Sequence, residues 1–74
     1  MDIKELTNFI AIAENGSISK AARELHISQP PLTKQLQRLE TELNVTLFER
    51  TSKGVTLTKK GRMFYRRALS LIAF

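Results

Sequence analysis

The sequence predicts a mostly α-helical fold, in which three helices are followed by a two-stranded β-hairpin and a fourth helix. Two observations carry this prediction. Apolar residues recur at helical spacing in four segments, which are separated by short breaks rich in Asn, Gly, Ser and Pro. Between the third and fourth segments, two short runs of β-type residues flank a Ser-Lys-Gly turn. The chain has 74 residues, which suffice for one small domain with one modest core.

The first helix is expected over residues 2–14, with an apolar face that repeats at helical spacing. Asp2 at its start and Glu5 three residues later form a capping-box pair, in which each side chain satisfies a backbone N–H of the other residue. Asn15 and Gly16 form a typical helix stop, because glycine adopts the left-handed conformation without a steric clash.

A second, shorter helix follows at once. Either Ser17 or Ser19 is expected to cap its start, and the helix ends near Leu25. Residues 26–28 then form the turn to the third helix, and we expect Ile27 in this turn to insert into the core. The result is a short helix, a three-residue break and a longer helix.

The third helix begins with two prolines and ends at Leu43, with Asn44 in the position that glycine more often fills. Prolines are tolerated only in the first helical turn, where the backbone N–H groups have no partner within the helix. The amides that a capping Ser28 normally bonds would therefore belong to prolines, so its hydroxyl is free for another partner, such as a phosphate oxygen. The buried face of this helix is a stripe of four leucines, Leu32, Leu36, Leu39 and Leu43.

The opposite face of the third helix carries polar side chains that suit base recognition. Pro30, Thr33, Lys34 and Gln37 point away from the leucine stripe. A helix that is held from behind and presents such residues has the chemistry to read base edges in a DNA major groove. The alternative is an ordinary amphipathic helix with a solvated face. The short helix before it and the basic hairpin after it favour the DNA interpretation.

The hairpin is expected to pair residues 46–50 with residues 55–57, and Thr58 can cap a last helix that begins at Lys59. That helix ends in an apolar sequence without a stop signal, so we expect the native chain to continue. A membrane-surface helix is one alternative for this apolar segment. We favour a dimer seam, because so small a domain needs more buried area; the seam residues would be Phe64, Ala68, Leu71 and Ile72.

The charge of the chain points to a polyanionic partner. Lys and Arg number 12 against 7 Asp and Glu, for a net charge of +5, and the pI is about 10.1. Between Arg50 and Arg67 the chain has seven basic residues and no acidic one, whereas three acids lie just before this run. A phosphate backbone would favour the basic region and repel the acidic one.

Several other classes of function are disfavoured. The chain has no Cys and a single His, His26, which we assign to a turn, so no metal site or cofactor is expected. Glu40 and the other acids resemble ordinary helix-surface residues without a catalytic partner, so an enzyme is not expected. A protein-interaction module and a single-stranded RNA binder remain alternatives. There is no apolar run of membrane length and no secretory leader, which favours a cytoplasmic protein.

Small, apolar and polar residues over the whole length of the chain together form a recognisable pattern. They are Phe9, Ala13, Ser17, Ala21, Ala22, Leu25, Ser28, Gln29, Pro30, Leu32 to Leu36, Leu39, Glu40, Leu43, Leu47, Phe48, Arg50, Leu57, Thr58 and Gly61. By these residues the whole chain resembles the N-terminal winged helix-turn-helix DNA-binding domain of LysR-type bacterial transcriptional regulators. Thr33 and Lys34 depart from the Ser and Arg that are frequent in the family, and Lys34 lacks the planar fork with which Arg selects guanine.

This resemblance implies a division of labour along the chain. Residues 1–58 would form the winged helix-turn-helix, and residues 59–74 a linker helix that forms a homodimer on an inverted-repeat duplex. A small-molecule effector would bind a further domain that is absent from this sequence. The regulator would act in the cytoplasm, at the nucleoid.

The resemblance also implies the DNA contacts. The third helix would lie in the major groove and the wing, which is the β-hairpin, would lie at the minor groove. For Lys53 the alternative is a solvated turn residue. The base contacts would be Gln29, Pro30, Thr33 and Lys34; the phosphate contacts Ser28 with Gln35 or Arg38; and the wing contacts Arg50 and Lys53.

Overall fold

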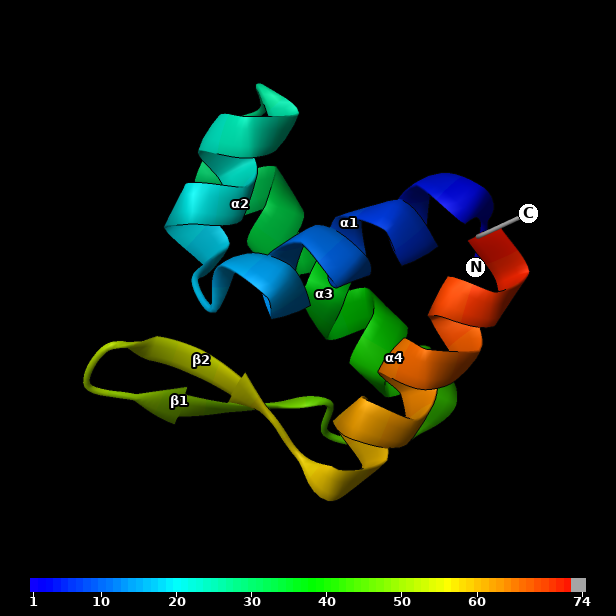
Figure 1. The fold of residues 1–74 in the computed structure, drawn as a ribbon. Coiled ribbons are helices and arrows are strands. Elements are labelled where there is room, and N and C mark those ends of the chain that lie inside the picture. Colours follow the sequence, from blue (N-terminus) through cyan, green and yellow to red (C-terminus); the bar gives the residue numbers. More distant parts are fainter. Residues whose placement is uncertain (73–74) are drawn as a thin grey trace.

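The computed structural model describes residues 1–72 and confirms the predicted winged helix-turn-helix. Figure 1 shows α1 in the middle of the molecule, with α3 passing behind it, α2 near the end of α1 and α4 on the side where α1 begins. The two-stranded hairpin projects away from the helices as the wing. The elements are α1 (Ile3–Asn15), α2 (Ile18–Leu25), α3 (Gln29–Leu43), β1 (Phe48–Thr51), β2 (Gly54–Leu57) and α4 (Lys59–Ile72).

The helix ends follow the capping residues. The capping box is present, because the Glu5 N–H donates to Asp2 Oδ1 at 2.8 Å and the Asp2 N–H donates to Glu5 Oε1 at 3.1 Å. Gly16 ends α1 in the left-handed conformation, with φ at 63°. Of the two serines considered, Ser17 caps α2 by accepting from the Lys20 N–H at 3.2 Å.

The start of α3 confirms the reasoning from its prolines. Ser28 occupies the N-cap position with extended backbone but makes no side-chain capping hydrogen bond. The next residues, Gln29, Pro30 and Pro31, form the first turn, so two of the amides that Ser28 normally bonds do not exist. Asn44 ends α3 in the left-handed conformation, as predicted, with φ at 54°.

Phe9 lies at the centre of the core. Its ring centroid is 5.3 Å from that of Phe48 in β1 and 5.0 Å from that of Phe64 in α4, so one residue of α1 joins the wing to the last helix. Three of the four stripe leucines of α3 are buried, and Leu43 is partly buried against the core. The helices α1 and α2 thus support α3 on its leucine face.

The prediction for Ile27 is wrong. Its side chain is 38% exposed and does not enter the core. The reason is the turn itself: His26 adopts the left-handed conformation, and the Ile27 N–H bonds back to the Ala22 carbonyl, which leaves the Ile27 side chain on the outside of the corner. Backbone hydrogen bonds, and not burial of Ile27, therefore fix the turn of the helix-turn-helix.

The wing is anchored close to its tip. The Val55 N–H donates to the Gly16 carbonyl at 3.0 Å, which fixes β2 to the turn between α1 and α2. The antiparallel register runs from Phe48 opposite Leu57 to Thr51 opposite Gly54, so Ser52 and Lys53 form a two-residue tip.

The first strand begins two residues later than predicted. The carbonyls of Thr46 and Leu47 accept from the side chain and the backbone N–H of Thr58, at 2.6 and 2.9 Å. Because these two carbonyls bond to Thr58 at the start of α4, they do not pair with β2. The hydrogen-bond ladder to β2 therefore begins only at Phe48. Thr58 also accepts from the Gly61 N–H at 2.9 Å and so caps α4 as predicted.

Candidate nucleic-acid interface

The outward face of α3 is mostly exposed to solvent. Gln29, Pro30 and Lys34 are exposed, and Thr33 is half-buried on one flank. Arg38 is also exposed, one turn after Lys34. The structure thus brings the four predicted base-contacting residues together on one helix face, at the end where α3 is reached from the turn.

A cleft separates this face of α3 from the wing, and we call it the wing-side cleft. Thr33 and Gln37 line it from α3, and Arg50 lines it from β1. Ile18 at the start of α2 lies at its floor with Val55, and both are buried. The structure therefore places a predicted base contact and a predicted wing contact around one open space. Gln37, which was expected only to point outward, belongs to the same group.

A second cleft lies on the opposite flank of α3, against α1, and we call it the α1-side cleft. Ser28 and Gln35 line this cleft, together with Lys4 of α1. Of the two predicted alternatives for a phosphate contact, Gln35 lines this cleft and Arg38 does not. Lys4 was missed by sequence reasoning, because it lies far from α3 in the sequence.

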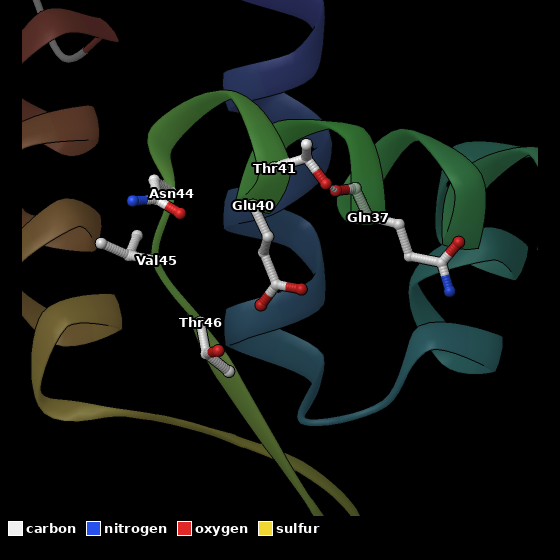
Figure 2. A pocket seen from close by; sticks show the side chains of 6 residues that line it. All are labelled: Gln37, Glu40, Thr41, Asn44, Val45 and Thr46. Carbon is white, nitrogen blue, oxygen red and sulfur yellow. Dashed lines mark hydrogen bonds between the residues drawn. The ribbon is translucent and has the colours of Figure 1, made fainter.

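Glu40 connects α3 to the wing. Its Oε2 accepts from the Leu47 N–H at 2.6 Å and from the Phe48 N–H at 3.3 Å. Figure 2 shows the Glu40 side chain extending from α3 toward the chain segment that carries Thr46. A carboxylate that accepts two backbone N–H groups forms a charge-assisted clamp.

The assignment of Glu40 as a helix-surface acid is therefore wrong. The side chain is half-buried and bonded to the backbone that leads into β1. One signal could have identified it: Glu40 follows Leu36 by four residues and Leu39 by one, which places it at the edge of the buried stripe. An acid at that edge meets whatever packs beside the helix.

The basic side chains of the interface are not neutralised by neighbouring acids. Within residues 1–72, both ion pairs use the N-terminal ammonium group, with Glu5 and Glu42 as partners. No Lys or Arg side chain of that part of the chain lies in an ion pair. Arg50 and Lys53 are both exposed on the wing, so their charges face outward with those of Lys34 and Arg38.

The predicted dimer seam on α4 needs a correction. Ala68 is 1% exposed and packs in the core of its own chain, and Phe64 packs edge-on against Phe9, so Ala68 cannot face a partner. The reason is that α4 folds back against α1, where the hydroxyl of Tyr65 donates to Glu14 Oε2 at 3.0 Å. This hydrogen bond, together with burial and the nearby negative charge, raises the pKa of Tyr65.

The apolar surface that α4 leaves exposed is narrower. Leu71 is 60% exposed and Met63 is 47% exposed, while Ile72 is partly buried against the core. Met63 and Phe64 also line an apolar groove between α4 and the end of α3, opposite Leu43 and Val45. In residues 1–72, no helix combines the length and the apolar character needed to cross a bilayer.

Comparison with known proteins gives matches over nearly the whole chain. The family model for the "Bacterial regulatory helix-turn-helix protein, lysR family" matches residues 3–62. The chain is 54% identical over 72 residues to the HTH-type transcriptional regulator ClcR of Pseudomonas putida; the match covers 97% of this chain and 24% of ClcR. The chain therefore spans about a quarter of the length of this relative.

Two solved structures of DNA complexes share the fold. One is the BenM DNA-binding domain with catB site 1 DNA, which has a TM-score of 0.94 and 44% identity and covers 99% of this chain and 82% of that chain. BenM is an HTH-type transcriptional regulator of Acinetobacter baylyi. The other is the CbnR DNA-binding domain with DNA, which has a TM-score of 0.93 and 44% identity and covers 99% of this chain and 84% of that chain.

Proposed function

We propose that this chain, which belongs to the lysR family of bacterial regulatory helix-turn-helix proteins, binds double-stranded DNA in a sequence-specific manner. The observation that carries the proposal is the outward face of α3, which stands between two clefts and carries uncompensated positive charge. A helix of this kind fits the major groove, and the clefts leave room for the two backbones that border the groove. DNA complexes of the similar BenM and CbnR domains support this proposal.

The base contacts are assigned to the exposed face of α3. The Gln29 amide can pair with N6 and N7 of adenine, and the carbon atoms of Pro30 and Thr33 can meet a thymine methyl group. Lys34 supplies a point charge toward a base acceptor, without the fixed geometry of Arg. We assign Ser28, Gln35 and Arg38 to phosphates, because each lies beside this face.

The wing is assigned to the adjacent minor groove. Lys53 stands exposed at the two-residue tip, and Arg50 lies nearer the wing-side cleft. A narrow, A·T-rich minor groove carries enhanced negative potential, which attracts such cations. The Glu40 clamp holds the base of the wing, and the Val55 bond to Gly16 holds β2 near the tip, so both keep the wing in place for this contact.

We further propose a homodimer through α4 that binds an inverted repeat. A second copy would cover Leu71 and Met63, together with the apolar groove that Met63 and Phe64 border. Burial of a large apolar side chain is worth roughly 1.5–3 kcal/mol, so pairing would stabilise a small domain. The boundary at residue 58 then separates the DNA-binding part from the dimerisation helix by role. It does not separate two folding units, because α4 contributes Ala68 to the core of the domain.

In the full regulator, this domain would direct transcription and carry no catalytic activity of its own. Its site of action would be bacterial DNA in the cytoplasm, and an effector would act through a domain outside residues 1–74. These statements about the whole protein are proposals, since the chain covers 24% of its relative ClcR.

Selection of bound sequences from a random duplex pool tests the function. The expected result is enrichment of one motif that appears twice, as an inverted repeat, with the two half-sites on one face of the duplex. Recovery of unrelated sequences, at affinities equal to that of the starting pool, would refute sequence-specific binding.

A further inference from the structure

Asn8 is the one buried polar side chain among residues 1–72, at 6% exposure. It lies on α1 among apolar residues, where it faces α3 next to Leu32, Leu36 and Leu39. Burying a side-chain amide costs free energy unless its polar atoms are hydrogen-bonded, and an apolar residue would pack here without that cost. The presence of an amide at this point of the core therefore calls for a physical role.

The Asn8 amide bonds to a residue of the proposed DNA interface. Its Nδ2 donates to Oε1 of Gln35, which is half-buried on the flank of α3. The acceptor atom of Gln35 is thereby held toward the core. Its amino group, Nε2, has two N–H donors that bond to no other residue within residues 1–72.

Gln35 lines the α1-side cleft, together with Lys4 and Ser28. An ammonium group, a hydroxyl without a capping bond and an amide N–H are all donors, and a phosphate has only acceptor oxygens. The first turn of α3 contains two prolines, so it presents fewer backbone N–H groups to an anion than an ordinary helix start. Side-chain donors beside the helix start would replace them.

We propose that Asn8 is a positioning residue for DNA binding, which orients the Gln35 amide so that its N–H groups face a backbone phosphate in the α1-side cleft. The inference rests on the proposed function, since it requires that DNA be the ligand. Reversal of the Gln35 amide would turn its oxygen toward the phosphate and replace an attraction with a repulsion. The Asn8 donor opposes this reversal, because its Nδ2 would lose the Gln35 oxygen as acceptor.

A double-mutant cycle tests the proposal. Duplex binding is measured by fluorescence anisotropy, on a site obtained by selection, for the wild type, Asn8→Leu, Gln35→Ala and the double variant. Asn8→Leu should raise the Kd roughly three- to tenfold, the range for one hydrogen bond, although the substituted side chain is buried. In the Gln35→Ala background the same substitution should leave the Kd unchanged, because the group that Asn8 orients is gone.

A matched control separates positioning from folding. Asn15 is a second amide on α1, and its Nδ2 donates only to the Ala11 carbonyl of its own helix, so Asn15→Ala should leave DNA affinity at the wild-type value. All binding is measured below the onset of thermal unfolding of each variant. In ¹⁵N-labelled protein, the Gln35 side-chain amide signal should shift on addition of DNA in the wild type and should lose that shift in Asn8→Leu.

The outcomes separate this proposal from the function on which it rests. If the wild type binds no duplex, the proposed function falls and the role of Asn8 falls with it. If the wild type binds and Asn8→Leu binds equally well, only the role of Asn8 is overturned. An equal loss on Asn8→Leu in the wild-type and Gln35→Ala backgrounds would also overturn it, because Asn8 would then act through the fold and not through Gln35.

Discussion

The Oε2 atom of Glu40 accepts a hydrogen bond from the backbone N–H of Leu47 at 2.6 Å. The same oxygen accepts from the next backbone N–H, so the third helix and the start of the wing are joined by a carboxylate clamp. The clamp lies between the two parts of the proposed interface, since α3 is assigned to the major groove and the wing to the minor groove. Their relative placement therefore depends on an acidic residue inside a basic domain.

Replacement of Glu40 by Ala should destabilise the fold. Two backbone N–H groups would lose a charged acceptor, and hydrogen bonds to charged groups contribute about 1.5–3 kcal/mol each. Because the bond from the Phe48 N–H is long, at 3.3 Å, we expect a loss close to that of one such bond, roughly 2 kcal/mol in the free energy of unfolding, measured by urea denaturation. Glu24→Ala removes an exposed acid from α2 and serves as the control, with an expected change below about 0.5 kcal/mol. Equal, small effects of both substitutions would show that the clamp contributes nothing.

Gly54 lies close against the turn between α1 and α2. A Cβ atom at this position would lie 2.1 Å from the Gly16 carbonyl oxygen, and φ at Gly54 is 144°. Gly54→Ala should therefore force β2 away from Gly16, break the Val55 hydrogen bond and lower the midpoint of thermal unfolding. Gly16→Ala is a milder control, because its Cβ would meet only the Val55 oxygen at 3.8 Å and its left-handed backbone costs about 1–2 kcal/mol. A smaller effect at Gly54 than at Gly16 would contradict this geometry.

Binding to DNA should depend strongly on salt. If the basic surface makes about five phosphate contacts, log K should fall against log salt with a slope near −4 to −5. Anisotropy titrations between about 50 and 200 mM salt measure this slope. A slope near zero would mean that the exposed cations do not meet phosphates. Lys34→Ala is expected to make the slope shallower by roughly one only if it contacts a phosphate instead of a base.

Leu71→Glu should disrupt the proposed dimer and leave the domain folded. Leu71 is 60% exposed in one chain, so its replacement removes little from the core, whereas a charge in the dimer seam would be desolvated. Ser70→Glu, next to it on α4 and also exposed, is the control for added charge. Sedimentation should show a dimer for the wild type and the control, and a monomer for Leu71→Glu. A wild type that stays monomeric at high concentration, both free and on an inverted repeat, would refute the dimer.

Sequence patterns predicted the elements whose signals are local. The capping box of Asp2 and Glu5, the glycine stop at Gly16 and the uncapped Ser28 all depend on neighbours within a few residues, and all are present. The leucine stripe predicted which face of α3 is buried, and so which face is free. These features follow from helical periodicity and from the chemistry of helix ends.

Other features depended on contacts between distant parts of the chain and were missed for that reason. The partner of Asn8 is 27 residues away, and Glu40 reaches the backbone of a segment whose path the helix pattern does not define. Ala68 was assigned to a dimer seam, because the stripe on α4 does not reveal that α1 already covers part of it. Ile27 was placed in the core, although the left-handed His26 turns it outward.

The central claim is that the exposed face of α3 reads the DNA sequence. The affinity of the wild type and of Gln29→Ala for a selected duplex and for a random duplex tests this claim most directly. Gln29→Ala should lose about 1–3 kcal/mol of binding free energy on the selected site and far less on the random one. Lys59→Ala, at the start of α4, should weaken both duplexes by the same factor if it meets phosphate. An equal loss on both duplexes for Gln29→Ala would contradict the claim, because α3 would then hold DNA without reading it.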